Sequence, residues 1–239
     1  MQDLFIESVL SVNRELFNLI KNGLSDFHFV YHDIGFGGDV SSKIDLVAED
    51  MFVKKLLQFG QIYSEESGII GDGEYKIVID PIDGSHNLLS GFPYFGTSVS
   101  LEKDGKSFVG IICNLANGDI FIKTKEYFKV GNLFTNVYKD ETSTDFTKIS
   151  IFEKSYANEK LTQKLIESSI KFRSPGALAL SLAYAHRVGF LLFNGKLREF
   201  DVNAGLFMCE DLNIYKKDKL LLISKDLNLF NNILQLVTE

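Results

Sequence analysis

A short apolar run that ends in a pair of aspartates constrains this chain most. Residues 76–79 are typical of a buried strand, and the residues that follow them are Asp80-Pro81-Ile82-Asp83-Gly84-Ser85. Pro81 fixes φ and Gly84 permits a tight bend, so we expect Asp80 and Asp83 to face one small space in a turn at the strand end. Several oxygens and negative charge suit a hard divalent cation. An ordinary turn is the competing interpretation.

Strands and helices alternate along the whole chain. Helical periodicity predicts helices over residues 3–22, 45–58, 157–169, 177–187, 201–210 and 227–237. Apolar runs and alternation predict strands over residues 61–63, 76–79, 97–101, 108–113, 120–123, 148–152, 170–173, 190–193 and 220–223. This mixture implies an α/β fold of stacked layers. We expect a loop over 25–43, and a boundary within the polar stretch 131–148 that divides an N-terminal half (1–140) from a C-terminal half (141–239).

Composition excludes several classes of function. The 239 residues, 45% apolar and 24% charged, are enough for one large domain or two smaller ones. A net charge of −7 argues against a broad nucleic-acid surface, which needs clustered Lys and Arg. Two cysteines form neither a disulfide framework nor a zinc motif, so we expect a reduced, cytoplasmic setting. We expect no signal peptide, and no membrane span, because no apolar run approaches about 20 residues.

Three further acidic features extend the aspartate pair. Glu65 and Glu66 follow a predicted strand, Asp45 and Asp50 lie in a predicted helix, and Asp201 precedes an apolar helix. Each has a simpler explanation. The glutamates suit a solvated surface, Asp45 and Asp50 suit the first turn of a helix, and Asp201 suits a helix N-cap.

Four motifs occur together in this chain: Glu65-Glu66-Ser67, Asp80-Pro81-Ile82-Asp83-Gly84-Ser85-x-Asn87, Gly91-Phe92-Pro93 and Phe200-Asp201-Val202-x-Ala204-Gly205. The chain resembles the inositol monophosphatase family of the magnesium-dependent, lithium-sensitive phosphatase superfamily, which also contains the fructose-1,6-bisphosphatases. The resemblance implies alternating layers of helices and mixed sheets, a sugar-phosphatase-like αβαβα sandwich. Residues 38–45 and 197–201 look more like fructose-bisphosphatases and archaeal enzymes with both activities.

The resemblance implies a set of metal ligands for two or three Mg²⁺ ions, with Mn²⁺ as a substitute. Glu65 and Asp80, with the Ile82 carbonyl, are expected to bind one ion. Asp80, Asp83 and Asp201 are expected to bind a second, and Glu65 reaches a third. Few protein ligands suffice, because Mg²⁺ keeps several of its waters.

The resemblance also implies roles in hydrolysis and substrate binding. Glu65 and Ser85 are expected to orient the attacking water, with Ser85 held by either Asp45 or Asp50. The residues expected to contact substrate are Asp83, Gly84, Ser85, Gly176, Ala177 and Asp201. Further candidates for the site are Asp39, Lys43, Glu66, Arg173 and Arg198.

The leading hypothesis is a magnesium-dependent phosphomonoesterase for a small metabolite, with inositol monophosphate as the nominal substrate. Fructose 1,6-bisphosphate is the nearest alternative, favoured by the five-residue spacing of Asp45 and Asp50, and a 3′-phosphoadenosine nucleotide ranks lower. A hypothesis of another class is a non-catalytic metal-binding protein of the same fold. Lithium sensitivity and a homodimer are expected from the family alone. His86 and the segment 210–213 depart from the family pattern, which leaves the substrate pocket and the oligomer surface open.

Overall fold

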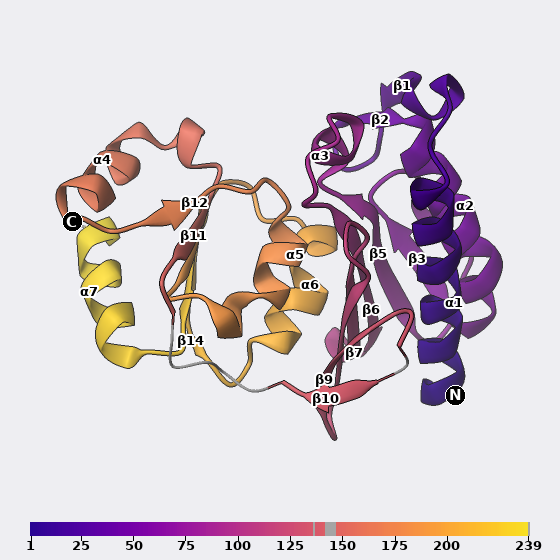
Figure 1. Ribbon diagram of the computed structural model, residues 1–239. Helices are drawn as coiled ribbons and strands as arrows, with labels where there is room; N and C mark the ends of the chain where they lie inside the picture. Colours follow the sequence, from indigo (N-terminus) through magenta and orange to yellow (C-terminus); the bar gives the residue numbers. More distant parts are fainter. Residues whose placement is uncertain (136, 142–146, 239) are drawn as a thin grey trace.

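Two sheets and three layers of helices stack in the order helix, sheet, helix, sheet, helix (Figure 1). The computed structural model describes residues 1–135, 137–141 and 147–238. The helices are α1 (Gln2–Lys21), α2 (Lys43–Leu56), α3 (Ser85–Leu89), α4 (Glu159–Glu167), α5 (Leu178–Ala183), α6 (Glu199–Met208) and α7 (Leu227–Thr238). Helices α1 and α2 cover one face of the larger sheet, α5 and α6 lie between the sheets, and α4 and α7 form the outer layer.

The larger sheet has eight strands in the order β10-β9-β8-β7-β6-β5-β3-β4. Its strands are β3 (Gln61–Ser64), β4 (Gly68–Ile70), β5 (Lys76–Asp83), β6 (Gly96–Lys103), β7 (Lys106–Asn114), β8 (Asp119–Thr124), β9 (Phe128–Asn132) and β10 (Tyr138–Asp140). All neighbours are antiparallel except β3 and β5, which are parallel. The carboxyl ends of β3 and β5 therefore meet at the same edge, which brings Glu65 near Asp80.

The smaller sheet has five strands in the order β12-β11-β13-β15-β14. Its strands are β11 (Ser150–Glu153), β12 (Phe172–Arg173), β13 (Leu191–Asn194), β14 (Asn213–Lys217) and β15 (Leu220–Ser224). A separate hairpin pairs β1 (Tyr31–Ile34) with β2 (Val40–Ser42). The predicted boundary at 140/141 lies between β10, in the larger sheet, and β11, in the smaller sheet. The stretch 131–148 around it lies partly outside the described residues, and the division into two halves stays a prediction.

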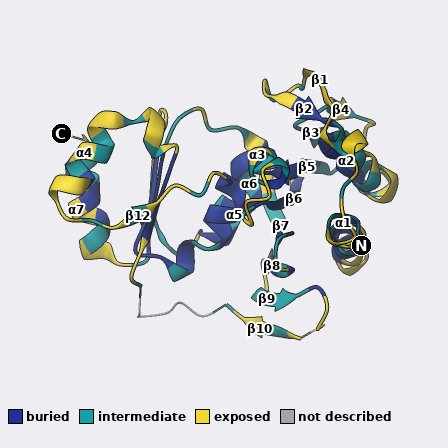
Figure 2. Ribbon diagram, turned by 45° about the horizontal axis from the view of Figure 1, so that its top comes forward, coloured by how far each residue is buried: buried dark blue, intermediate teal, exposed yellow. Residues whose placement is uncertain are grey.

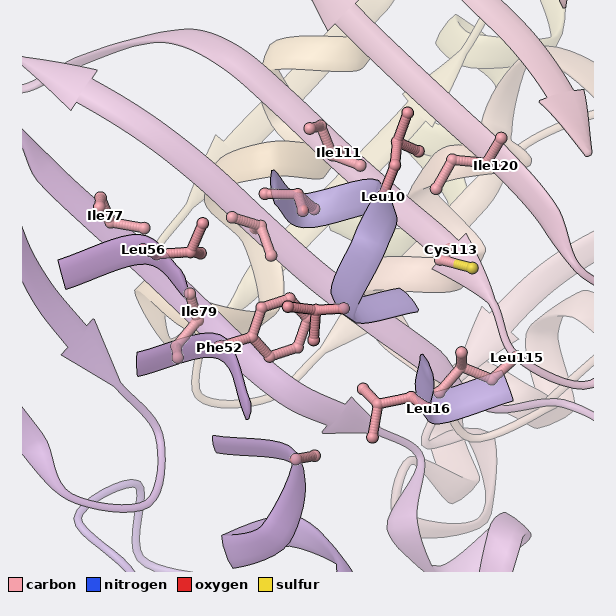
Figure 3. Packing of buried hydrophobic residues seen from close by; sticks show 14 of the residues in the cluster. Leu10, Leu16, Phe52, Leu56, Ile77, Ile79, Ile111, Cys113, Leu115 and Ile120 are labelled. Atoms are coloured by element: carbon pink, nitrogen blue, oxygen red, sulfur yellow. The ribbon is translucent and has the colours of Figure 1, made fainter. Parts of the chain in front are cut away.

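Strand side chains alternate between the cores on either side of each sheet, as the period of two requires. Ile111 of β7 packs under α1 and α2, whereas Ile112 packs toward α5 and α6. In β15, Leu221 faces the middle helices and Leu222 faces α7. Figure 3 shows the first of these cores, where the helix residues Leu10 and Phe52 lie against strand residues such as Ile79. Figure 2 shows the middle helices α5 and α6 as largely buried.

The structure differs from the predicted secondary structure in three respects. Residues 25–43 are not a loop throughout, because β1 and β2 pair within them. All four residues of β1 are exposed, so no apolar alternation marks that strand. The edge strands β4, β10 and β14 and the neighbouring strand β9 were not predicted, because strands that bury little carry a weak apolar pattern. Helix α6 starts at Glu199 with Arg198 as its N-cap, so Asp201 is not the cap.

The strand predicted over residues 76–79 is longer in the structure. β5 continues through Pro81 to Asp83, and its pairing with β6 shifts register between Asp80 and Asp83. Residues three apart in a regular strand point to opposite faces. One extra residue in β5, next to a proline that has no N–H to donate, corrects this. This bulge lets Asp80 and Asp83 line the same pocket.

Candidate active site

A polar pocket lies where β5 ends, between the β1–β2 loop, the start of α6 and the loop that precedes α5. Side chains from both sheets line it, so the pocket exists only once the layers are stacked. The lining residues are Gly35, Asp39, Val40, Asp45, Glu65, Glu66, Asp80, Ile82, Asp83, Gly84, Ser85, His86, Glu153, Lys154, Tyr156, Gly176, Leu178, Phe193, Arg198 and Asp201.

Three acids from distant parts of the chain converge in this pocket. Glu65, Asp80 and Asp201 each offer a carboxylate oxygen, and these atoms lie within 4.8 Å of one another. Asp80 is 2% exposed and Asp201 is 6% exposed. Asp83 also lines the pocket, where its Oδ2 accepts a hydrogen bond from the Leu180 N–H at 2.7 Å. The structure thus brings into one pocket the four acids that the sequence analysis expected to bind metal.

Burial makes the Asp80 and Glu65 carboxyls costly to ionise. It raises the pKa of Asp80, and the charges of Glu65 and Asp83 raise that pKa further. It also raises the pKa of Glu65 to about 7, although Arg198 opposes the shift. Asp80 Oδ1 is buried and has no hydrogen-bond partner in the described structure. An unpaired oxygen among converging carboxylates is the arrangement that a hard divalent cation would satisfy, so the residues fit such an ion.

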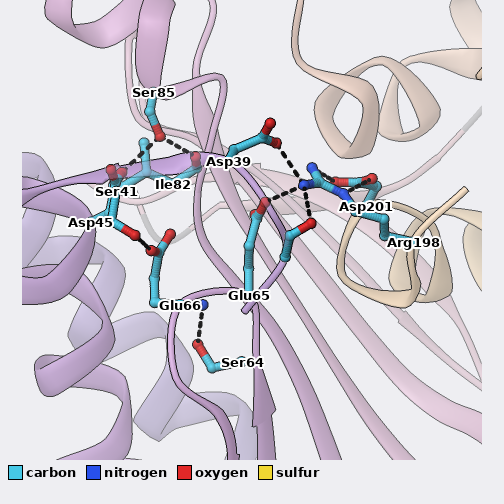
Figure 4. Close-up of polar contacts among 11 residues, drawn as sticks. Asp39, Ser41, Asp45, Ser64, Glu65, Glu66, Ile82, Ser85, Arg198 and Asp201 are labelled. Atoms are coloured by element: carbon cyan, nitrogen blue, oxygen red, sulfur yellow. Dashed lines mark hydrogen bonds and ion pairs between the residues drawn. The ribbon is translucent and has the colours of Figure 1, made fainter. Parts of the chain in front are cut away.

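A guanidinium group lies among the acids (Figure 4). Arg198 Nε and Nη2 donate to the two oxygens of Asp201 at 2.8 and 2.9 Å. Its Nη1 lies 2.7 Å from Glu65 Oε1 and 2.6 Å from Asp39 Oδ2. Asp39 and Arg198, two of the further candidates from the sequence, are therefore part of the pocket.

A hydroxyl and a carboxylate form a fixed pair beside the acids. Ser85 Oγ lies 2.7 Å from Asp45 Oδ1 and 2.9 Å from the Ile82 carbonyl oxygen. The other oxygen of Asp45 accepts hydrogen bonds from the N–H and the hydroxyl of Ser42, both at 2.7 Å, in a capping box that starts α2. Asp45 is therefore held in one orientation by the helix start, and it holds Ser85.

The structure decides between Asp45 and Asp50. Five residues turn an α-helix by about 140° beyond a full turn, so the two side chains point to different sides of α2. Asp45 is buried, whereas Asp50 is exposed and pairs with Lys54 one turn later. Asp50 does not reach the pocket, and its selection as a catalytic candidate was wrong.

Glu153 is a buried acid of the pocket that the sequence analysis missed. Glu153 ends β11 and is only 2% exposed. It accepts hydrogen bonds from the Gly176 N–H at 2.8 Å, the Ala177 N–H at 3.4 Å and the Ser181 hydroxyl at 2.5 Å. Glu153 thereby fixes the loop that carries Gly176 and Ala177, two of the predicted substrate contacts. An acid that directly ends an apolar run, as Asp80 does, was the available signal.

The remaining candidates separate clearly. Glu66 lines the pocket and hydrogen-bonds Ser41, and burial raises its pKa to about 7. Lys43 does not line the pocket, and its Nζ lies 5.3 Å from the centre of the Phe27 ring. Arg173 is exposed, outside the pocket, and donates to the Phe172 carbonyl. The structure thus places two of the basic candidates away from the acids.

The raised pKa values predict how the stability of the metal-free protein depends on pH. The pKa of Glu65 is about 7 in the folded protein and 4.5 for an ordinary glutamate, so between these pH values folded Glu65 keeps a proton that the unfolded chain has released. Its contribution is present below about pH 4.5 and is lost as pH rises through about 7, by about 3 kcal/mol for a shift of this size. Thermal melts in EDTA should therefore show a falling Tm over this range.

Glu65→Gln is the matched variant for this measurement, because it has no carboxyl to titrate at that position. Its Tm should fall less steeply than that of the wild type between about pH 5 and about pH 7. Parallel profiles for the two proteins would show that Glu65 does not titrate as described.

The sequence is similar to those of several known proteins. The model of the inositol monophosphatase family matches residues 6–213. A fructose-1,6-bisphosphatase of Pyrococcus furiosus is 27% identical over 188 residues, which cover 76% of this chain and 71% of that protein. A protein named Nus factor SuhB from Xylella fastidiosa is 30% identical over 191 residues, which cover 75% of this chain and 69% of that one.

Solved structures share the fold. A Bartonella henselae structure titled extragenic suppressor protein suhB superposes with a TM-score of 0.78 at 20% identity, covering 98% of this chain and 97% of that chain. The structure titled MJ0109 gene product, inositol monophosphatase-fructose 1,6 bisphosphatase, has a TM-score of 0.77 at 19% identity and covers 99% of each chain. No helix among the described residues is both long and apolar enough to span a bilayer. With the family match over most of its length and this layered fold, the chain belongs to the inositol monophosphatase family.

Proposed function

We propose that this protein is a magnesium-dependent phosphomonoesterase that acts on a small phosphorylated metabolite. The observation that carries the proposal is the convergence of Glu65, Asp80 and Asp201, with an unpaired, buried oxygen on Asp80. This arrangement stands beside the fixed Ser85–Asp45 pair. Family membership supports the same class of reaction, and relatives from Pyrococcus furiosus and Thermococcus kodakarensis carry phosphatase names.

In this proposal the pocket residues have distinct roles. Glu65, Asp80, Asp83, Asp201 and the Ile82 carbonyl would hold Mg²⁺, or Mn²⁺ in its place. When bound, these ions supply the positive charge that stabilises a phosphoryl group as its ester bond breaks.

The Ser85–Asp45 pair would orient the attacking water. The Ser85 hydroxyl donates its proton to Asp45, so its lone pairs are free to accept a hydrogen bond from water. Because Ser42 fixes Asp45, the direction of the Ser85 lone pairs is set before substrate binds. Glu65 is the second carboxylate proposed to face this water. Substrate would meet Gly84 and Gly176 on the pocket wall. Ala177, also selected from the sequence, is 1% exposed and is not among the residues that line the pocket.

Inositol monophosphate is the nominal substrate, and fructose 1,6-bisphosphate is the second candidate. The spacing of Asp45 and Asp50 no longer favours the bisphosphate, because Asp50 lies outside the pocket. A different observation does. Lys154 and Tyr156 also line the pocket, and a cation and a phenol suit a second phosphate. Relatives named for both activities occur in Thermococcus kodakarensis and Methanocaldococcus jannaschii.

A substrate panel tests the proposal. Free phosphate is measured from inositol 1-phosphate, fructose 1,6-bisphosphate, a 3′-phosphoadenosine nucleotide and NADP, each with Mg²⁺ and with EDTA. We expect release from at least one substrate with Mg²⁺ and none with EDTA. If the folded protein binds Mg²⁺ but hydrolyses none of them, the non-catalytic alternative is favoured.

Lys154→Ala separates the two leading substrates. If Lys154 binds a second phosphate, the variant loses about tenfold in kcat/KM for the bisphosphate and little for the monophosphate. Equal losses for both would place Lys154 outside substrate selection. Lithium inhibition, a cytoplasmic location and a homodimer are proposed from family membership and the residue composition alone.

A further inference from the structure

Arg198 occupies the centre of the acid group from a position that the helix start dictates. It is the N-cap of α6, and Asp201 lies three residues later in the first turn. This spacing lets the guanidinium fold back over the helix end and bind both oxygens of Asp201. The side chain of Arg198 is 18% exposed, so the pair is largely shielded from water.

The same guanidinium reaches the opposite side of the pocket. Nη1 lies 2.7 Å from Glu65 Oε1, so one side chain bridges Glu65 and Asp201. These are two of the three acids whose oxygens converge within 4.8 Å. Each oxygen of Asp201 accepts one hydrogen bond from the guanidinium and keeps a second lone pair, but the positive charge held against both oxygens repels a metal ion while the bidentate contact lasts.

The neutralisation is incomplete. Asp80 Oδ1 has no partner, although Asp80 is 2% exposed. One guanidinium charge faces Glu65, Asp80 and Asp201 together, whereas a divalent ion would bring two charges and could contact all three. The acid group is therefore poised for exchange of one cation for another.

The guanidinium also has anchors that do not belong to the acid group. Nη1 donates to Asp39 Oδ2 at 2.6 Å and to the Gly37 carbonyl at 3.4 Å, both in the β1–β2 loop. The Asp39 side chain is 76% exposed, so this contact is the weaker one. An arginine released from Asp201 and Glu65 would still have Asp39 as a partner on the pocket rim.

We propose that Arg198 takes the place of the metal ion in the metal-free protein, and that a divalent ion binds by displacing its guanidinium from Asp201 and Glu65. This inference rests on the proposed function, because it requires the acids to bind metal. It makes Arg198 a competitor that weakens metal affinity, rather than a group that strengthens it. Removal of the Arg198 guanidinium should therefore tighten metal binding.

Metal titration of variants tests the competition. Mn²⁺ is titrated into metal-free protein, and the free ion is measured by its EPR signal, at a pH above 8 so that protons compete little. Arg198→Gln should bind Mn²⁺ about tenfold or more tightly than the wild type, and Arg198→Lys should lie between them. Arg198→Gln should also lower the Tm in EDTA and increase the rise in Tm on metal addition.

Arg187→Gln is the matched control. Arg187 also makes a two-pronged contact with a carboxylate, because its Nε and Nη2 donate to the two oxygens of Glu141 at 3.2 and 2.8 Å. It does not line the pocket. This variant should lose Tm without a change in Mn²⁺ affinity. Unchanged or weaker Mn²⁺ binding by Arg198→Gln would overturn the competition. A wild type that binds no Mn²⁺ would overturn the proposed function as well, so the two failures are distinguishable.

Chemical labelling of the wild type tests the displacement without a variant. The chain has four arginines, so phenylglyoxal adducts can be assigned by peptide mass. Mg²⁺ should increase labelling of Arg198 several-fold and leave exposed Arg173 unchanged. Labelling of Arg198 that stays constant or decreases with saturating Mg²⁺ would contradict its release.

Discussion

Asp80→Asn is expected to abolish phosphate release, with a loss in kcat/KM of about 1,000-fold or more, and to leave the metal-free fold intact. The loss follows because Asp80 is the acid whose oxygen has no partner within the described structure, and an amide would offer one weak ligand atom in place of a carboxylate. Steady-state phosphate release with saturating Mg²⁺ measures it.

Stability distinguishes this acid from a structural one. Burial and neighbouring acids raise the pKa of Asp80, so its ionised form destabilises the metal-free fold. Asn is neutral and similar in shape, so the Tm in EDTA should stay the same or rise. Added Mg²⁺ should raise the Tm of the wild type and not that of the variant. Asp72→Asn, at an exposed position, is the control. A large fall in Tm in EDTA would show instead that Asp80 holds the fold together.

The second large effect concerns the hydroxyl–carboxylate pair. Ser85→Ala and Asp45→Asn should each lower kcat about 100-fold or more, because Asp45 orients the hydroxyl that positions the water. The double variant should lose about as much as either single variant, since the two residues act as one unit. Mg²⁺ affinity, measured by titration, should change little in all three.

Two controls make this experiment specific. Asp50→Asn changes an acid in the same helix that lies outside the pocket, and Ser90→Ala changes an exposed serine at the end of α3. Both should retain near wild-type kcat. If the fold-losses in kcat of the two single variants multiply in the double variant, the pairing is contradicted, because that is the result expected for residues that act independently.

The site could be predicted from sequence where the motif itself carries the chemistry. Asp80 and Asp83 follow a buried apolar run, and that local pattern is sufficient to suggest an oxygen-rich strand end. The layers were also predictable, because helical and strand periods differ and mark their own segments. Strands that bury little, such as β1 and β14, leave a weaker pattern and were missed.

The choice between Asp45 and Asp50 shows where local reasoning ends. Both acids fit the first turns of a helix, and spacing alone favours neither. The packing of α2 against β5 decides which side of the helix meets Ser85. The role of Glu153 likewise depends on the loop before α5, which lies more than 20 residues later in the chain.

The sequence by itself determined the family, the alternating layers and the identity of the acids, because these depend on residue type and short-range period. Only the tertiary structure decided that Asp201 reaches Glu65 and Asp80, that the β5 bulge turns Asp83 toward the same pocket, and that Arg198 lies among them. Asp201 and Arg198 meet Glu65 across more than 100 positions of the chain, and that geometry is set by the stacking of two sheets across α5 and α6. No local pattern encodes such distances, because they result from how all the layers pack at once.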